Sequence, residues 1–131
     1  MRAIPYLFFG GECGNALDFY RETLGAEVKT VVRFRDMPGA APKKGDQIMH
    51  AEFSIGSSMV FASDAQEKRA EPGGFAVSLE VANDTEAQRL YQSISRDGKV
   101  DVPLINTPFA SSFCMVTDRF GTPWMISALK Q

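Results

Sequence analysis

The sequence predicts an α+β fold in which one order of elements, strand–helix–strand–strand–strand, occurs twice. At 131 residues the chain has the usual size of one domain. Its two predicted helical segments share a short sequence pattern, Ala16-x-x-x-Tyr20 and Ala87-x-x-x-Tyr91. Together with the repeated order of elements, this shared pattern indicates an internal duplication. The modules are expected at about residues 1–64 and 74–131, joined by a connector at 65–73.

The first half is predicted to contain a strand, a helix and three further strands. Gly10-Gly11 ends a short apolar run, and Gly25 follows a segment with an apolar stripe at helical spacing. A stretch rich in Val and Phe comes next, and a hairpin is expected around Gly56-Ser57-Ser58. The expected elements are strand 4–9, helix 13–24 and strands 27–35, 48–55 and 59–63.

The second half repeats this order. Asn83 is expected to cap a helix, with Glu86 three residues on as its capping-box partner, and Gly98 to end it. Asp118 is expected to bond local amides in a turn where Gly121 supplies an unusual backbone angle. The expected strands are residues 75–81, 100–104, 112–117 and 123–129.

Composition excludes several classes of protein. Charged residues make up 23% of the chain, and its formal net charge is −2, which argues against a nucleic-acid partner. The apolar N-terminal run is too short for a signal peptide and is interrupted by Pro5. No segment approaches the length of a membrane span. We therefore expect a cytoplasmic protein without a membrane partner.

The two cysteines are expected to be reduced thiols. Cys114 lies in an apolar strand pattern and is expected in the core. Cys13 falls near the start of a predicted helix, where the pKa of a thiol can be lowered. A buried structural thiol is the more ordinary alternative for Cys13.

Four stretches of the chain carry a family likeness. They are Pro5-Tyr6-Leu7-Phe8-Phe9, Ala16-Leu17-Asp18-Phe19-Tyr20-Arg21-Glu22-Thr23-Leu24-Gly25, Ile48-Met49-His50-Ala51-Glu52-Phe53-Ser54-Ile55-Gly56, and Asp118-Arg119-Phe120-Gly121-Thr122-Pro123-Trp124-Met125-Ile126. In these stretches the chain resembles the vicinal oxygen chelate superfamily, which includes glyoxalase, bleomycin-resistance and extradiol dioxygenase proteins. Within the superfamily the chain is similar to the PhnB-like branch. The resemblance implies two βαβββ modules with mixed sheets curled around a cavity, helices on the outer face, and a homodimer. In one departure, Ala110-Ser111 stands where PhnB-like chains often carry Trp-Gly, a region that can line the cavity.

The resemblance also implies four metal-ligand positions, one on each of four strands. These positions fall at or beside Pro5, near Phe61-Ala62, at Phe75 and at Met125. None of these side chains is a usual ligand for zinc or a hard cation. We therefore expect no metal and no cofactor.

The one histidine of the chain, His50, lies in the predicted strand 48–55. His50, Glu52 and Ser54 share one face, while Ala51 and Phe53 face the other way toward the helix layer. The functional interpretation is a polar pair in the ligand cavity, with Glu52 able to orient His50. The alternative is a solvated strand face or a dimer contact.

Two loops carry competing interpretations. Gly10-Gly11-Glu12-Cys13-Gly14 could suggest a nucleotide loop, but its spacing is not Gly-x-Gly-x-x-Gly and a tight turn is favoured. The loop 36–46 carries Lys43 and Lys44 among Pro and Gly residues. It is either a lid over the cavity or a solvent loop.

The leading hypothesis is a dimeric, metal-free protein that binds a small, partly apolar molecule. The expected cavity residues are His50, Glu52, Leu7, Phe75 and Met125, because apolar walls with few polar groups are typical of ligand sites. One alternative is a lyase, isomerase or dioxygenase-type enzyme that uses His50 as a base or an unrecognised metal site. Another is an interaction module without a ligand.

Overall fold

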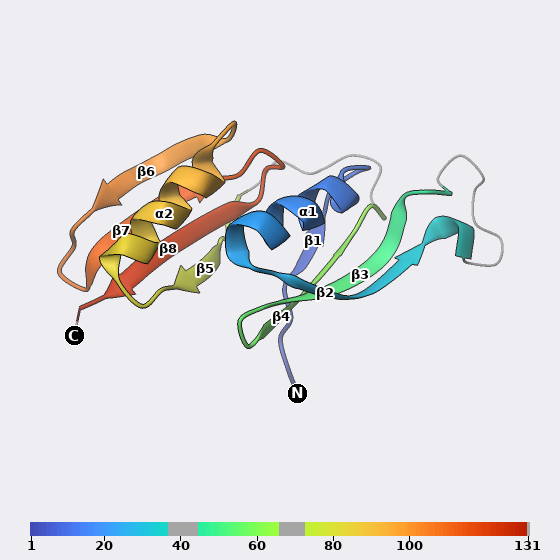
Figure 1. Ribbon diagram of the computed structural model, residues 1–131, viewed down its shortest axis with the longest axis horizontal. Coiled ribbons are helices and arrows are strands. Elements are labelled where there is room, and N and C mark those ends of the chain that lie inside the picture. The colour runs from blue at the N-terminus through green and yellow to red at the C-terminus, as the bar shows by residue number, and fades with distance from the viewer. Residues whose placement is uncertain (37–44, 66–72, 131) are drawn as a thin grey trace. The chain divides into compact units, whose positions relative to one another are not determined.

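The computed structural model describes residues 1–36, 45–65 and 73–130, and the chain divides into two compact units, Met1–Ala70 and Glu71–Gln131 (Figure 1). In the part of the chain that is described, each unit contains a four-stranded mixed sheet and an α-helix. The α+β class and the repeated order of elements predicted from the sequence are confirmed.

In the first unit, the helix packs against one face of the sheet. The strand order is β1-β4-β3-β2, with β1 parallel to β4 and the other neighbours antiparallel. The elements are β1 (Tyr6–Phe8), α1 (Cys13–Leu24), β2 (Glu27–Arg33), a 3₁₀ turn η1 (Phe34–Asp36), β3 (Ile48–Ile55) and β4 (Ser58–Ser63).

The alternation of side chains along β3 decides which of them meet α1. Ala51 and Phe53 are fully buried, and the Phe53 ring stacks on Tyr20 of α1 with centroids 5.9 Å apart. Burying a side chain of this size contributes about 2 kcal/mol. Because successive strand residues point to opposite faces, His50 and Glu52 lie on the face away from α1. This confirms the division of the strand predicted from its pattern.

The second unit repeats this arrangement. Its strand order is β5-β8-β7-β6, again with one parallel pair, β5 and β8. On β8, Trp124 and Ile126 are fully buried, whereas Met125 between them is half-buried and pairs in register with Ser78 and Met115. The elements are β5 (Val77–Glu80), α2 (Asp84–Ser95), β6 (Lys99–Ile105), β7 (Ala110–Thr117) and β8 (Pro123–Leu129).

The ends of α2 follow from the residues beside them. The Asn83 side chain accepts a hydrogen bond of 2.9 Å from the Glu86 N–H, which confirms the predicted N-cap. The Glu86 carboxylate contacts Arg89 instead of completing a capping box. The helix ends at Ser95 with Arg96 as its C-cap, before the stop predicted at Gly98. A Cβ added to Gly98 would lie 2.2 Å from the carbonyl oxygen of Thr117. Only glycine fits this close approach of two backbones.

Several strands are shorter than predicted because hydrogen-bonded pairing limits their length. The first strand was expected over residues 4–9 but forms only at Tyr6–Phe8, where it pairs with β4. The strand expected at 75–81 forms at Val77–Glu80 and leaves Phe75 outside the sheet. The strand expected to reach residue 35 ends at Arg33 because η1 follows.

Candidate functional site

A hydrogen-bonded chain of three side chains, Tyr6, His50 and Glu52, lies on the sheet face of the first unit away from α1. Register places them together, because Tyr6 pairs with Phe61 on β4 and Phe61 pairs with Glu52 on β3. His50 is two residues before Glu52 and so shares its face. The structure therefore brings together residues 44 positions apart in the sequence.

Both ring nitrogens of His50 have partners. Nδ1 lies 3.0 Å from the Tyr6 hydroxyl, and Nε2 lies 3.0 Å from the Glu52 carboxylate. A carboxylate only accepts hydrogen bonds, so Nε2 carries the ring proton in this arrangement and donates it to Glu52. Nδ1 of the neutral ring is then an acceptor, and the Tyr6 O–H donates to it. Glu52 orients the imidazole, as the sequence suggested.

Aromatic rings frame this polar chain. Tyr6 stacks on Phe8 with centroids 4.8 Å apart, and the edge-on pair of His50 and Phe61 has centroids 5.0 Å apart. The side chains of His50 and Glu52 remain 25% and 34% exposed, and Tyr6 is 37% exposed. The result is an apolar surface with a fixed, accessible polar chain, the composition that ligand sites use. We name Tyr6, Phe8, His50, Glu52 and Phe61 the Tyr–His–Glu site.

Not all of the expected cavity residues lie with His50. Leu7 is only 6% exposed and pairs with Ala62 in the buried layer, so it lies on the opposite face from Tyr6. Phe75 and Met125 belong to the second unit, where Phe75 is 58% exposed. Their role in a cavity stays a prediction. Tyr6 and Phe8 were not predicted as site residues, although the alternation that buries Leu7 places both of them on the opposite face, where Tyr6 contacts His50.

The metal positions implied by the superfamily are held by side chains that do not ligate metals. Pro5 directly precedes β1, Phe61 and Ala62 lie on β4, Phe75 precedes β5, and Met125 lies on β8. Within residues 1–36, 45–65 and 73–130, no group of three or more His, Cys, Asp or Glu side chains is placed to hold a metal ion. The superfamily's metal does not fit these residues, and the expected absence of metal stays a prediction.

The turn between β1 and α1 is structural. Gly10 and Gly11 adopt φ angles of 58° and 113°, which favour glycine. The Asp64 carboxylate accepts hydrogen bonds of 2.7 and 2.9 Å from the N–H groups of Gly11 and Cys13. The amides that a nucleotide loop would offer to a phosphate are therefore already bound. The tight-turn interpretation is confirmed.

The hypothesis of an activated Cys13 thiol is wrong. Burial, reinforced by the neighbouring Asp64 carboxylate, raises the pKa of Cys13 to about 12. Burial also raises the pKa of Cys114 to about 11. Both thiols are free and buried, and a buried thiol stays protonated and unreactive.

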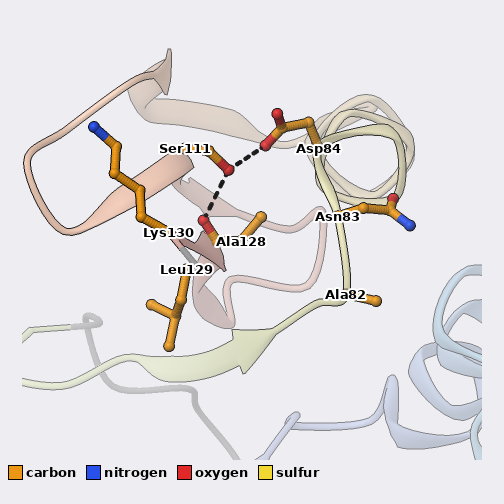
Figure 2. A pocket seen from close by; sticks show the side chains of 7 residues that line it. All are labelled: Ala82, Asn83, Asp84, Ser111, Ala128, Leu129 and Lys130. Carbon is orange, nitrogen blue, oxygen red and sulfur yellow. Dashed lines mark hydrogen bonds between the residues drawn. The ribbon is translucent and has the colours of Figure 1, made fainter.

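The second unit has a hollow of about 360 Å³ beside the start of α2 (Figure 2). Asp84 accepts hydrogen bonds of 2.5 and 2.7 Å from the hydroxyls of Ser111 and Ser112. These two donors hold the pKa of Asp84 below its ordinary value. Ser111 belongs to the segment where the chain departs from the PhnB-like pattern. The lining residues are Ala82, Asn83, Asp84, Ser111, Ala128, Leu129 and Lys130.

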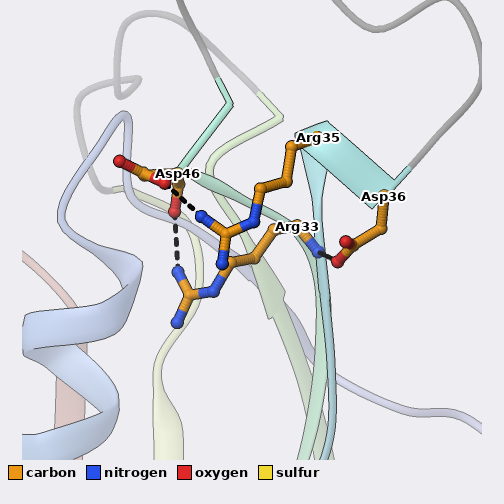
Figure 3. A network of polar contacts seen from close by, with 4 residues as sticks. All are labelled: Arg33, Arg35, Asp36 and Asp46. Atoms are coloured by element: carbon orange, nitrogen blue, oxygen red, sulfur yellow. Dashed lines mark hydrogen bonds and ion pairs between the residues drawn. The ribbon is translucent and has the colours of Figure 1, made fainter.

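The ends of the loop 36–46 are tied together by charged side chains (Figure 3). Arg33 donates a hydrogen bond of 2.6 Å to the Asp46 carbonyl oxygen, and its own N–H donates to the Asp36 carboxylate. Arg35 pairs with the Asp46 carboxylate. Residues 37–44, which include Lys43 and Lys44, lie outside the described residues. The lid hypothesis concerns these residues and therefore stays a prediction.

Comparison with known proteins agrees with this architecture. A glyoxylase/bleomycin resistance protein/dioxygenase domain from Frankia sp. EAN1pec shares the fold, with a TM-score of 0.70, 14% identity, and coverage of 99% of this chain and 98% of that one. The PhnB protein from Bacillus cereus gives a TM-score of 0.81 at 19% identity, covering 98% and 99%. The two repeated units therefore define a protein of the vicinal oxygen chelate fold.

Closer relatives define the family. The family model described as 3-demethylubiquinone-9 3-methyltransferase matches residues 1–127. Protein YjdN of Escherichia coli (strain K12) is 34% identical over 139 residues, covering 97% of this chain and 95% of that protein. Protein PA1353 from Pseudomonas aeruginosa is 38% identical, with a TM-score of 0.89 and coverage of 100% and 99%. The chain belongs to this PhnB-like family. None of the helices in the described residues is long and apolar enough to cross a membrane.

Proposed function

We propose that this protein binds a small, partly apolar molecule at the Tyr–His–Glu site, with His50 and Glu52 in its polar part. The observation that carries this proposal is the Tyr6–His50–Glu52 chain, with both hydrogen bonds at 3.0 Å, the Phe8 ring stacked on Tyr6 and the Phe61 ring edge-on to His50. Fixed polar groups on an apolar wall orient a ligand, while the wall supplies most of the affinity. Sequestering a drug-like compound is one use of such a site.

The partial exposure of the site supports this proposal. Tyr6 and Phe8 are among the large apolar side chains that the first unit leaves exposed. Removing such a ring from water stabilises a complex by about 25 cal/mol per Å² of apolar surface. The hydrogen bonds hold Tyr6 and His50 in place before a ligand arrives, which lowers the entropic cost of binding.

A thermal-shift screen of small aromatic and aliphatic compounds tests the proposal. A ligand that binds the native state at 100 times its Kd adds about 2.7 kcal/mol to the free energy of unfolding. For each compound that raises the melting temperature, His50→Ala is expected to reduce the shift. Ser54→Ala is the matched control, because Ser54 lies on the same strand face, four residues after His50. If His50→Ala leaves every shift unchanged, the binding site is elsewhere and the proposal fails.

A second candidate function is proton-transfer catalysis, as in a lyase or isomerase. The arrangement acid–imidazole–hydroxyl favours it, because it resembles the order of groups in catalytic triads. Turnover of a bound compound by the wild-type protein, lost in Glu52→Gln, would distinguish catalysis from sequestration.

We also propose that the chain is a homodimer, because the resemblance to its superfamily implies one. Light scattering coupled to gel filtration measures this directly. The expected mass is twice the 14.4 kDa of the chain. A mass equal to that of one chain at micromolar concentration would reject the dimer.

A further inference from the structure

The hydrogen bonds around His50 limit which atoms of the site can bind a ligand directly. Nε2 is engaged with Glu52 and Nδ1 with Tyr6. The imidazole therefore has no free nitrogen to offer. A base role for His50 acting directly on a ligand does not fit this geometry. Tyr6 lies at one end of this hydrogen-bonded chain and is 37% exposed.

We infer that Tyr6 meets the ligand directly, and that this ligand donates a hydrogen bond to the Tyr6 oxygen from a hydroxyl or N–H group on a flat apolar body. This inference rests on the proposed function of the site. His50 and Glu52 are positioning residues that act through Tyr6.

The direction of donation follows from the proton count along the chain. The Glu52 carboxylate accepts the Nε2 proton, and Nδ1 accepts the Tyr6 hydroxyl proton. The Tyr6 oxygen has then used its one proton and presents only lone pairs outward. A ligand ether or carbonyl oxygen would face those lone pairs without a donor, and desolvated polar groups left without a partner weaken binding. A ligand O–H satisfies them.

The shape of the ligand follows from the surrounding rings. Tyr6 and Phe8 are stacked at an interplanar angle of 28°, and the Phe61 ring lies edge-on to Tyr6 at 83°. Such a surface favours a planar ring, since aromatic pairs stack with offset or edge contacts. Phenols and other hydroxylated aromatic compounds combine the ring and the donor.

The arrangement also defines a route for a proton. The ligand O–H proton passes to the Tyr6 oxygen as the Tyr6 proton passes to Nδ1 of His50. The electron pair of the ligand O–H bond stays on the ligand oxygen, and the imidazolium that forms is paired with the Glu52 carboxylate. No oxidant or other reactant is needed, and the transfer is reversible.

Two probes of the same shape test the ligand class. The first is 2-naphthol, which donates a hydrogen bond, and the second is 2-methoxynaphthalene, which cannot. At pH 8, wild-type protein titrated by calorimetry is expected to bind 2-naphthol about 10-fold more tightly, equivalent to about 1.4 kcal/mol. Tyr6→Phe keeps the ring and removes the acceptor, so both probes should bind it alike. Ser54→Ala should keep the wild-type preference.

The outcomes separate the inference from the proposed function. Equal binding of the two probes to wild-type protein, with shifts of amide resonances at the Tyr–His–Glu site, overturns the inference and leaves the proposed function standing. Failure of 2-naphthol to bind also overturns the inference, and the thermal-shift screen then decides the proposed function separately.

A second measurement needs no variant. Because His50 is the one histidine of the chain, ¹⁵N-histidine labelling gives the signals of a single ring. At pH 8 the spectrum is expected to show a protonated Nε2 and an unprotonated Nδ1. The opposite tautomer would make Tyr6 an outward donor and overturn the inference.

Discussion

The indole Nε1 of Trp124 donates a hydrogen bond of 2.9 Å to the Asp118 carboxylate, and both residues are buried. The other carboxylate oxygen accepts hydrogen bonds of 2.9 and 3.0 Å from the N–H groups of Phe120 and Thr122. One side chain therefore holds the turn between β7 and β8 and also the largest ring of the second unit. The sequence pattern indicated the turn, whereas the bond to Trp124 became visible only in the structure.

Replacing Asp118 by Ala is expected to destabilise the protein by about 2–4 kcal/mol, because three buried donors lose their acceptor. Urea unfolding followed by fluorescence measures this, since Trp124 is the single tryptophan. Asp18→Ala is the control, because Asp18 is 66% exposed in its pair with Arg21. Asp18→Ala is expected to lower the free energy of unfolding by less than about 1 kcal/mol. Equal losses for the two variants would contradict the role of Asp118.

Gly98→Ala is expected to lower the free energy of unfolding by about 1–3 kcal/mol, the usual range for an overpacked site. The added Cβ would lie 2.2 Å from the Thr117 carbonyl oxygen, and a backbone atom cannot move away cheaply. Gly73→Ala is the matched control because no atom of the described residues lies within 4 Å of its Cβ position. The control is expected to change the free energy of unfolding by no more than about 0.5 kcal/mol. If the urea midpoints of both variants equal that of the wild type, the close approach of Gly98 to Thr117 does not require glycine.

Local sequence patterns correctly predicted the structural features that depend on residues close together in the sequence. The span of α1, its stop at Gly25 and the opposite faces of Ala51 and His50 all follow from periodicity over a few residues. The partnership of Tyr6 with His50 does not, because it depends on the register of β1 against β4 and of β4 against β3. A single sequence does not fix such register between distant strands. The same limit explains why Leu7 was expected beside His50 in place of Tyr6.

The chain is expected to be purified without stoichiometric metal. The positions where superfamily members hold metal ligands carry residues such as Pro5, Phe75 and Met125, which have no donor atoms suited to zinc or hard cations. Elemental analysis and thermal unfolding with and without a chelator are the measurements. Tightly held metal at one ion per chain, or a fall in melting temperature on chelation, would contradict this prediction.

Both thiols are expected to resist modification in the folded protein. Their pKa values are raised by burial, to about 12 for Cys13 and about 11 for Cys114, so little thiolate forms at pH 8. A colorimetric thiol reagent should therefore react slowly with the folded protein in buffer. In urea, where the chain is unfolded, it should react with both thiols of each chain. Fast reaction of one thiol in buffer would show that it is accessible, contrary to its burial.

The raised thiol pKa values also predict how stability changes in alkaline solution. The unfolded thiol ionises near its ordinary pKa of 9.0, whereas both folded thiols stay protonated to higher pH. Between these values the unfolded state binds fewer protons, so the free energy of unfolding falls as pH rises. This loss begins near pH 9 and continues toward the folded pKa of each thiol.

Urea unfolding at pH 8 and pH 10 measures the slope, and the Cys13→Ala, Cys114→Ala double variant is the control for other groups that titrate there. The wild type is expected to lose more stability than the double variant over this interval, and equal losses would mean that the thiols ionise alike in both states.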